Sequence, residues 1–202
     1  MFLRILRKLK ARAQERRVLV LGLDDAGKST FVGRLAGKGE EELQEIGPTV
    51  GFEIVTVVAP GSGLALNIWD IGGQRSLRPF WRNYFEETDA LFWVVDAASS
   101  PERLEQSWQE LSRVLHTEKL LGVPLVLVSN KSDLPHARLA LSPPPFLPLS
   151  TPVLRSGRGF HSGSSALSQI ESILLDGSSP PPTASQPSSS SSSPTERDQA
   201  SA

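Results

Sequence analysis

A glycine-rich turn near the start of the chain restricts the fold more than any other feature. Residues 22–29 fit the pattern G-x-x-x-x-G-K-[ST] and directly follow a short apolar run, residues 18–21. Residues 29–35 then resume a helical pattern. Backbone N–H groups in such a turn close on phosphate oxygens, and the N-terminus of the following helix adds a favourable dipole. The sequence therefore predicts a strand, a phosphate-binding loop and a helix.

Two side chains of this loop have expected roles. Lys28 is expected to contact the β and γ phosphates of a nucleotide, and the Ser29 hydroxyl to bind Mg²⁺. The alternative is a chance match in a glycine-rich turn, which average residue usage gives in roughly one chain in a hundred at this length. The position behind an apolar run makes that alternative weaker. The residues expected to surround the phosphates are Gly22, Asp24, Asp25, Ala26, Gly27, Lys28, Ser29 and Thr30.

A second motif, N-K-x-D, indicates which base is bound. Asn130, Lys131, Ser132 and Asp133 follow the apolar run of residues 125–128. The Asp133 carboxylate can accept hydrogen bonds from N1–H and the exocyclic amine of guanine, and adenine does not present that donor pattern. An unpaired buried group is costly, so the site would reject ATP. The alternatives are a glycosylation sequon or an ordinary polar loop, and the position at a strand end behind a phosphate loop disfavours both.

The order of apolar segments predicts the fold class. Residues 54–58 and 64–69 flank a Pro-Gly-Ser-Gly turn, which indicates an antiparallel hairpin. Residues 91–95 and 125–128 are continuous apolar runs on either side of a helical stretch, residues 101–115. We expect an α/β fold of the P-loop GTPase type with a mainly parallel sheet and one antiparallel hairpin.

Composition sets outer limits on function. The chain has 202 residues, of which 39% are apolar, so it can bury one ordinary core. It contains no cysteine, and its three histidines are scattered, which excludes disulfide frameworks and thiolate metal sites and fits a cytoplasmic setting. No apolar run approaches the roughly 20 residues that span a bilayer. We expect one GTPase domain over residues 18–135 and no nucleic-acid binding.

The N-terminal segment, residues 1–17, has an amphipathic helical pattern. Seven Arg and Lys side chains accompany a single acid, Glu15, and apolar residues recur at helical spacing. This pattern predicts a helix that makes weak peripheral contact with acidic lipid or with an acidic partner surface. Phe2 stands where an N-myristoylation signal needs glycine, so any attachment would be reversible.

The last third of the chain has a different character. Residues 136–176 are rich in Pro, Ser and Gly, and residues 177–202 are dominated by Ser and Pro, which predicts a disordered tail. Only residues 166–175 look helical. The sheet either lacks its last strand and closing helix, or keeps a remnant of them.

Two motifs between the phosphate loop and N-K-x-D carry a family resemblance. They are residues 48–52, Pro-Thr-Val-Gly-Phe, and residues 69–74, Trp-Asp-Ile-Gly-Gly-Gln, and a third run follows at residues 77–85. With these motifs, residues 1–135 resemble the ADP-ribosylation-factor family of small GTPases, in particular its Arf-like 2 and 3 branch. The family continues with a helix, a last strand, a Ser-Ala loop that touches the base, and a closing helix. Ser164, Ser165 and Ala166 are a candidate remnant of that loop and helix.

The resemblance implies further roles in binding and hydrolysis of GTP. Thr49 would supply a second Mg²⁺ contact in the GTP state, and Asp70 would lie in the outer shell of the metal. Gly73 would donate its N–H to the γ phosphate, and Gln74 would orient the attacking water. Gly47 stands where an arginine finger of the chain's own would be, so we expect slow hydrolysis that a partner accelerates.

The resemblance also implies partners. They are a GTPase-activating protein, an exchange factor, and effectors that include carriers of lipidated cargo, acting on a monomer in cytosolic, microtubule-associated or ciliary roles. Phe52, Trp69 and Tyr84 fall on the family's aromatic effector surface, although strand aromatics are equally expected in a core. Asp25 departs from the family by adding a carboxylate to the phosphate loop, which would repel phosphate unless it faces solvent.

Three hypotheses remain open on the sequence. The chain is a GTPase switch, or an incomplete non-enzymatic variant that acts as a binding module, or another P-loop enzyme such as an ATP-dependent kinase. Asn130 and Asp133, together with the motif from Asp70 to Gln74, disfavour the third hypothesis. The first two hypotheses differ in whether the last third of the chain completes the fold.

Overall fold

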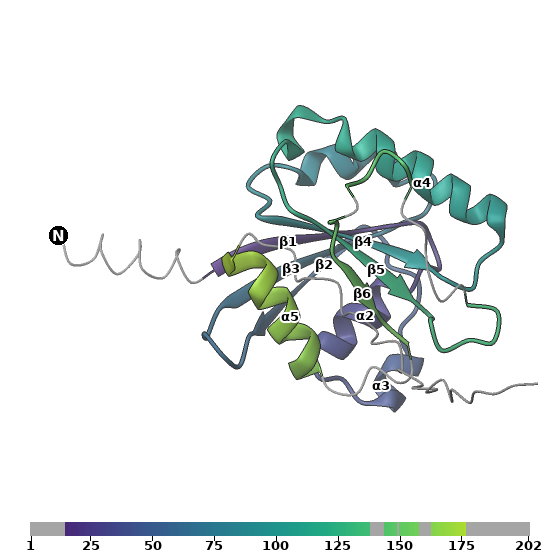
Figure 1. Ribbon diagram of the computed structural model, residues 1–202. Coiled ribbons are helices and arrows are strands. Elements are labelled where there is room, and N and C mark those ends of the chain that lie inside the picture. The colour runs from purple at the N-terminus through teal and green to yellow at the C-terminus, as the bar shows by residue number, and fades with distance from the viewer. Residues whose placement is uncertain (1–14, 138–143, 149, 158–162, 177–202) are drawn as a thin grey trace, which may run out of the picture.

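A six-stranded sheet forms the centre of the molecule (Figure 1). The computed structural model describes residues 15–137, 144–148, 150–157 and 163–176. The strand order is β2-β3-β1-β4-β5-β6, and every neighbouring pair is parallel except β2 and β3. The predicted fold class and hairpin are confirmed. The strands are β1 (Glu15–Leu21), β2 (Phe52–Val58), β3 (Ala65–Ile71), β4 (Ala90–Asp96), β5 (Leu125–Asn130) and β6 (Val153–Arg155).

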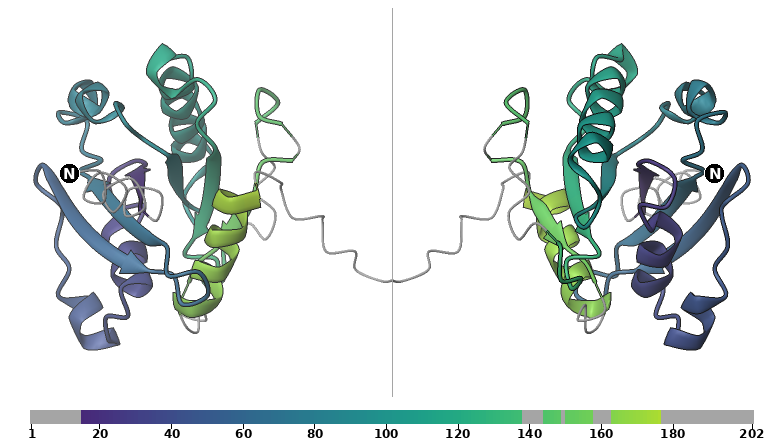
Figure 2. Two further views of the ribbon diagram at one scale, coloured as in Figure 1. Left: turned by 90° about the vertical axis from the view of Figure 1, so that its left-hand side faces the viewer. Right: turned by 90° about the vertical axis from the view of Figure 1, so that its right-hand side faces the viewer.

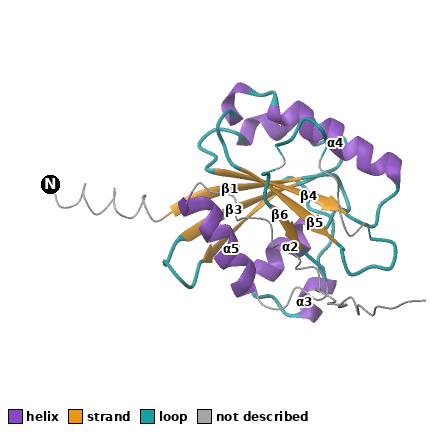
Figure 3. Cartoon of the chain, viewed as in Figure 1, coloured by secondary structure: helices purple, strands orange, loops and turns teal. Residues whose placement is uncertain are grey.

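Helices cover both faces of this sheet (Figures 2 and 3). Side chains of α2 and α5 pack on one face, and those of α4 and η1 on the other. Ser100 caps α4 by accepting a hydrogen bond from the Arg103 backbone N–H, so the predicted helix over residues 101–115 has a defined start. The helices are α2 (Lys28–Leu35), α3 (Glu40–Gln44), α4 (Pro101–Leu115) and α5 (Gly163–Asp176), with 3₁₀ helices η1 (Arg78–Tyr84) and η2 (Glu118–Leu120).

Strand β1 shows why the central strands are apolar throughout. Val18 and Val20 belong to the core under α2 and α5, whereas Leu19 and Leu21 belong to the core under α4. All four side chains are fully buried, because alternate residues of a strand point to opposite faces and both faces are covered. β1 begins at Glu15, three residues earlier than predicted, so residues 15–17 are strand and not helix.

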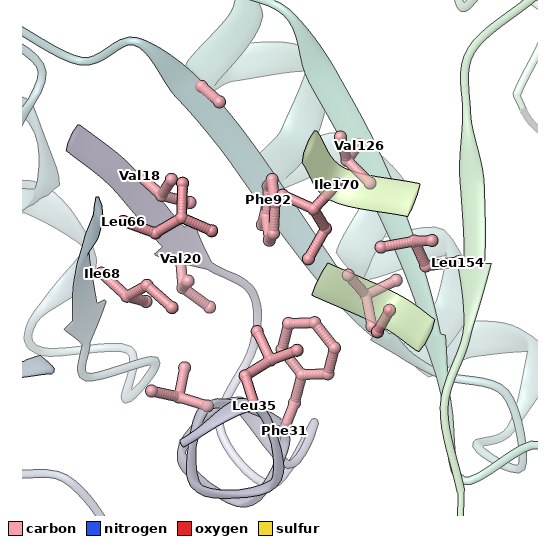
Figure 4. Close-up of a cluster of buried hydrophobic side chains, with 14 of the residues drawn as sticks. Val18, Val20, Phe31, Leu35, Leu66, Ile68, Phe92, Val126, Leu154 and Ile170 are labelled. Carbon is pink, nitrogen blue, oxygen red and sulfur yellow. The ribbon is translucent and has the colours of Figure 1, made fainter. Parts of the chain in front are cut away.

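The sheet is complete at its last position. β6 pairs with β5 in parallel register, with Leu127 opposite Val153 and Val128 opposite Leu154. Helix α5 then returns over the sheet, and its Ile170 reaches the side chains of Phe92 and Val126 (Figure 4). Of the two alternatives that the sequence left open, the structure therefore supports the one in which a last strand and a closing helix are kept, because three residues suffice for the strand and one apolar stripe for the helix.

Some predictions fall outside the described residues. Residues 1–14 of the amphipathic segment and residues 177–202 of the Ser- and Pro-rich tail both lie there. Within the described ranges, no helix combines the length and the apolar character that crossing a bilayer requires.

Candidate functional site

The predicted site residues meet at the carboxyl ends of the parallel strands. The phosphate loop follows β1, the Gly-Gly-Gln motif follows β3, and N-K-x-D begins at the end of β5. Ligands of open α/β sheets bind at this edge. A cavity of about 430 Å³ opens there, and its lining includes Lys28, Ser29, Thr49, Gly73 and Gln74.

At two positions of the phosphate loop, the backbone has a conformation that favours glycine. Gly22 and Gly27 have φ values of 148° and 79°, in the region that side chains disfavour. A Cβ at Gly27 would overlap the Asn130 amide nitrogen. That amide donates to the carbonyls of Ala26 and Gly27 at 2.8 and 3.3 Å, so the N-K-x-D motif holds the phosphate loop.

Lys28 is a buried cation at the centre of the site. Its Nζ donates to the Leu23 carbonyl at 2.9 Å. Burial lowers the pKa of Lys28 to about 8, although the carboxylates of Asp70 and Asp24 oppose that shift. A buried cation with a free donor capacity is ready to receive phosphate oxygens, because phosphate supplies both charge and acceptors.

Three oxygens converge beside the phosphate loop. Ser29 Oγ donates to Asp70 Oδ2 at 2.5 Å and lies 2.6 Å from Thr49 Oγ1. The second carboxylate oxygen, Asp70 Oδ1, is buried and has no hydrogen-bond partner among the described residues. Burial raises the pKa of Asp70, and the hydrogen bond from Ser29 and the charge of Lys28 oppose this. Hydroxyl and carboxylate oxygens of this arrangement are the donor set that Mg²⁺ prefers, so the residues fit that ion.

The Gly-Gly-Gln motif lies against the phosphate loop. Gly73 is buried so closely against Gly22, Leu23 and Asp24 that a Cβ would overlap their backbone atoms. Gln74 is exposed at the rim of the cavity. Its side chain is therefore accessible to a water molecule or to a partner protein.

The N-K-x-D side of the site includes residues that the sequence did not indicate. The Ser156 carbonyl accepts hydrogen bonds at 3.0 Å from both the backbone N–H and the hydroxyl of Ser132. Gly157 lies so close to the Asp133 carboxylate that a Cβ would overlap it. Ser156 and Gly157 therefore occupy the place beside Asp133, directly after β6.

This placement corrects one expectation. Ser165 and Ala166 belong to α5, where Ala166 packs in the core, so they do not form a loop beside the base. Residues 163–166 instead form the start of the closing helix. The candidate remnant therefore corresponds to the helix and not to the loop. A three-residue strand with one apolar side chain inside gave no periodic signal that could have identified Ser156.

Asp25 and Lys131 flank the same region. The Asp25 side chain is 95% exposed and lies 3.7 Å from Lys131 Nζ, which also pairs with Asp96 at 2.9 Å. Asp25 therefore faces solvent, the geometry in which its charge repels phosphate least. Both residues have positive φ values, 59° for Asp25 and 56° for Lys131.

Two arginines hold the phosphate loop from outside. Arg78 and Arg103 each place a guanidinium nitrogen 2.9 Å from Asp24 Oδ1. Burial opposes ionisation of Asp24, but the hydrogen bonds from Arg103 and Arg78 and the charge of Arg103 lower its pKa on balance. Arg78 lies in the run at residues 77–85 that resembles the family, which was the one sequence signal for it.

Phe52, Trp69 and Tyr84 form a partly exposed aromatic cluster, and Trp69 and Tyr84 also pack against the core under α4. The Phe52 ring stacks on Trp69 with centroids 5.5 Å apart, and Tyr84 is tilted against Phe52 at 5.4 Å. Phe52 is 47% exposed, and Trp69 and Tyr84 are half-buried. The Arg17 guanidinium lies 4.0 Å above the Trp69 ring. The alternative of simple core packing is thereby excluded for Phe52.

Comparison with known proteins decides the family. The model of the ADP-ribosylation factor family matches residues 2–148. The chain belongs to this family. It is 49% identical to ADP-ribosylation factor-like protein 2 of Drosophila melanogaster over 136 residues, which cover 67% of this chain and 71% of the relative. It is 50% identical to ADP-ribosylation factor-like protein 3 of Chlamydomonas reinhardtii over 132 residues, 65% of this chain and 71% of the relative.

A solved family structure extends the match to the whole fold. The Arl6 (BBS3) small GTPase of Trypanosoma brucei, whose structure holds the nucleotide analogue GppNp, superposes with a TM-score of 0.59 at 25% identity. The superposition covers 79% of this chain and 99% of the Arl6 chain. The chain is thus a small GTPase of the Arf family, a GTP-binding switch with the P-loop fold.

Proposed function

We propose that this chain is a Mg²⁺-dependent GTP/GDP switch that hydrolyses GTP slowly by itself and completes its site with a GTPase-activating partner. One observation supports this most: Lys28, Ser29, Thr49 and Gly73 line a single cavity. The oxygens of Ser29 and Thr49 lie together with Asp70 at its wall. Separate loops had to converge for that arrangement, which chance matches of motifs do not explain.

Each residue has a role that its position permits. Ser29 and Thr49 would hold Mg²⁺ directly, and Asp70 would accept hydrogen bonds from the water around the ion. When bound, Mg²⁺ neutralises charge on the β and γ phosphate oxygens. Lys28 would donate to the same oxygens, and the Gly73 N–H would contact the γ phosphate. Asp133 would accept from guanine, with Ser156 and Gly157 fixing its position.

Slow hydrolysis follows from what the rim of the cavity contains. Gln74 is exposed and can orient water only if something restrains it, and Gly47, which also lines the cavity, carries no side chain. A cation that stabilises the transition state would then come from a partner. The exchange factor and effectors would be further partners, with Phe52, Trp69 and Tyr84 as the effector surface. A cytoplasmic, peripheral-membrane, microtubule-associated or ciliary setting is the corresponding proposal for location.

Single-turnover hydrolysis of GTP tests the catalytic part. Gln74→Leu should retain GDP and GTP but lower partner-stimulated hydrolysis by about 100-fold, a loss of the size seen when one transition-state contact is removed. Gln109→Leu on α4 is the matched control, because Gln109 is exposed and its amide donates a hydrogen bond to Glu105 on the same helix. Equal rates for wild type and Gln74→Leu would remove Gln74 from the mechanism.

Removal of the metal tests the Mg²⁺ assignment. Excess EDTA should speed GDP release, and replacement of Thr49 by alanine should weaken Mg²⁺ dependence mainly in the GTP-bound form. If EDTA leaves release of a fluorescent GDP analogue unchanged, the oxygens of Ser29 and Thr49 do not serve a metal.

A further inference from the structure

Thr151 is partly exposed and lies directly before β6, the short strand at the end of the sheet. Its hydroxyl donates to the Pro148 carbonyl at 2.7 Å, and its backbone N–H donates to the same oxygen at 2.9 Å. Thr151 thus closes a turn with its own side chain. The next carbonyl, that of Pro152, accepts from the Leu127 N–H at 2.9 Å and begins the pairing of β6 with β5. The turn therefore fixes where the strand starts.

The proline after Thr151 makes this hydroxyl a candidate for modification. Proline-directed protein kinases phosphorylate Ser or Thr directly before Pro, in a segment that lies extended in the kinase cleft. Within the part of the chain that the structure describes, only Ser100 and Thr151 are directly followed by proline. Ser100 caps α4 and Pro101 is its first residue, whereas Pro152 leads into a strand. The segment after Thr151 therefore already approaches the backbone that a kinase binds, and the segment after Ser100 would first have to unwind.

Strand β6 is held by less buried surface than the other strands. It has three residues, against six or seven in each of the others. Leu154 is the buried one of the three, while Val153 is 43% exposed and Arg155 is exposed. Segments that bury few apolar side chains open locally at low cost in free energy. A kinase can therefore reach the Thr151 hydroxyl without unfolding of the whole domain.

The other end of β6 leads to the contacts that support the N-K-x-D motif. The Ser156 carbonyl accepts from the Ser132 N–H at 3.0 Å. Gly157 follows, and it lies against the Asp133 carboxylate. The three strand residues and one proline separate Thr151 from these contacts. A loss of pairing along β6 would therefore reach the residues beside Asp133.

We propose that Thr151 is a phosphorylation site for a proline-directed protein kinase, and that phosphate there speeds the release of GDP. In the reaction, Thr151 Oγ1 forms a bond to the γ phosphorus of ATP, and the bond from that phosphorus to the β–γ bridging oxygen breaks. ADP leaves, and the hydroxyl proton passes to a carboxylate of the kinase. The effect on GDP rests on the proposed function, whereas the modification itself does not.

Phosphate on Thr151 reverses what its side chain does at the turn. The proton that binds the Pro148 carbonyl is lost, and a group with a charge of about −1.5 to −2 at neutral pH takes its place beside that oxygen. Repulsion between the phosphate and the carbonyl oxygen opens the turn, so β6 loses its fixed start. Looser pairing of β6 then withdraws Ser156 and Gly157 from Asp133, and the base is held less firmly.

Kinase treatment of the full chain, loaded with a fluorescent GDP analogue, tests both parts of the proposal. The protein carries Ser142→Ala, Ser179→Ala and Ser193→Ala, which remove the Ser-Pro pairs outside the described residues. A mitogen-activated protein kinase with ATP and Mg²⁺ is the reagent, and mass spectrometry of proteolytic peptides locates the phosphate. We expect phosphate on Thr151 and release of the GDP analogue about threefold to tenfold faster than from untreated protein.

Thr151→Val is the matched control, because valine keeps the shape of the side chain but has no hydroxyl. The variant loses the hydrogen bond to Pro148 without gaining charge, so its GDP release should change by about twofold at most. Kinase treatment should not change that release further. Thr151→Ser keeps a hydroxyl and should respond to the kinase as wild type does.

The remaining outcomes separate the site, the coupling and the proposed function. Absence of phosphate on Thr151, with the kinase active on its standard substrate, would overturn the site. Phosphate on Thr151 with unchanged GDP release would overturn the coupling, and so would equally faster release from kinase-treated Thr151→Val. Untreated protein that cannot retain the GDP analogue contradicts the proposed function instead, and the mass spectrum still decides whether Thr151 is modified.

Discussion

Residues 15–135 and residues 144–176 belong to the same fold but differ in how far the family model matches their sequence. The model covers the whole of the first region and only the first few residues of the second. The first region carries every motif, and its strands each have six or seven residues. The second region contributes a three-residue strand and one helix, and the family model ends at residue 148, before that strand. Even so, the superposition on Arl6 covers 99% of that protein.

The difference shows how little sequence the last layer of this fold requires. β6 needs only backbone hydrogen bonds to β5 and one buried side chain, Leu154. α5 needs one apolar stripe, which Ala166, Leu167, Ile170 and Ile173 supply. The residue types of the proposed nucleotide site are more restricted, because each side chain has to present a particular donor or acceptor atom at a particular position.

The largest expected effect comes from removing α5. Deletion of residues 163–202 should abolish folding and nucleotide retention, because it exposes the sheet face that α5 covers. Three large buried side chains and Ala166 are lost with it, on the order of 5–10 kcal/mol and comparable with the whole stability of a domain. Circular dichroism and retention of bound GDP are the measurements.

The matched truncation removes only residues 177–202. It should leave both measurements unchanged, because all four core side chains of α5 precede residue 177. If both truncations retain GDP equally, α5 is dispensable for nucleotide retention.

A smaller effect, confined to the first region, is expected from Asp133→Asn. The change exchanges an acceptor for a donor that faces the guanine N–H groups, so GDP affinity should fall about 100-fold or more. Competition by xanthosine diphosphate, which has a carbonyl where guanine has an amino group, should improve in the variant. Unchanged preference for GDP would contradict the assigned base pocket.

Gly157→Ala tests whether the second region supports the first. The added methyl group would overlap the Asp133 carboxylate, so Asp133 would have to move. Overpacking of this kind typically costs about 1–3 kcal/mol, and we expect GDP affinity to fall about tenfold. Ser156→Ala is the control, since its buried hydroxyl has no hydrogen-bond partner among the described residues. Equal GDP affinities in both variants, measured by titration, would mean that Asp133 is positioned without Gly157.

The smallest effect is expected from Asp25→Asn, a change within the first region where the chain departs from its family. Removal of the charge should slow GDP release about twofold to fivefold, and the difference should shrink at high salt because the side chain faces water. Stopped-flow release of a fluorescent GDP analogue measures it. Faster release in the variant would show that the Asp25 contact with Lys131 matters more than repulsion.

The sequence by itself determined the fold class and most of the nucleotide site. The phosphate loop and N-K-x-D could be identified because each role is set by a residue type at a fixed spacing within one segment. Glycine at positions 22 and 27 is required by the local backbone, and Lys28 is the buried cation that the phosphate-loop pattern predicts. The buried strands β4 and β5 were also predictable, since short continuous apolar runs suit strands that are covered on both faces.

Only the tertiary structure decided the contacts between segments that lie far apart in the chain. Ser156 and Gly157 reach Asp133 because β6 pairs with β5, and a strand of three residues is too short to show a period of two. Arg78 reaches Asp24 across 54 positions of sequence, and nothing in its neighbourhood marks that partner. Local patterns specify backbone conformation, but which charges and edges meet depends on how the layers pack.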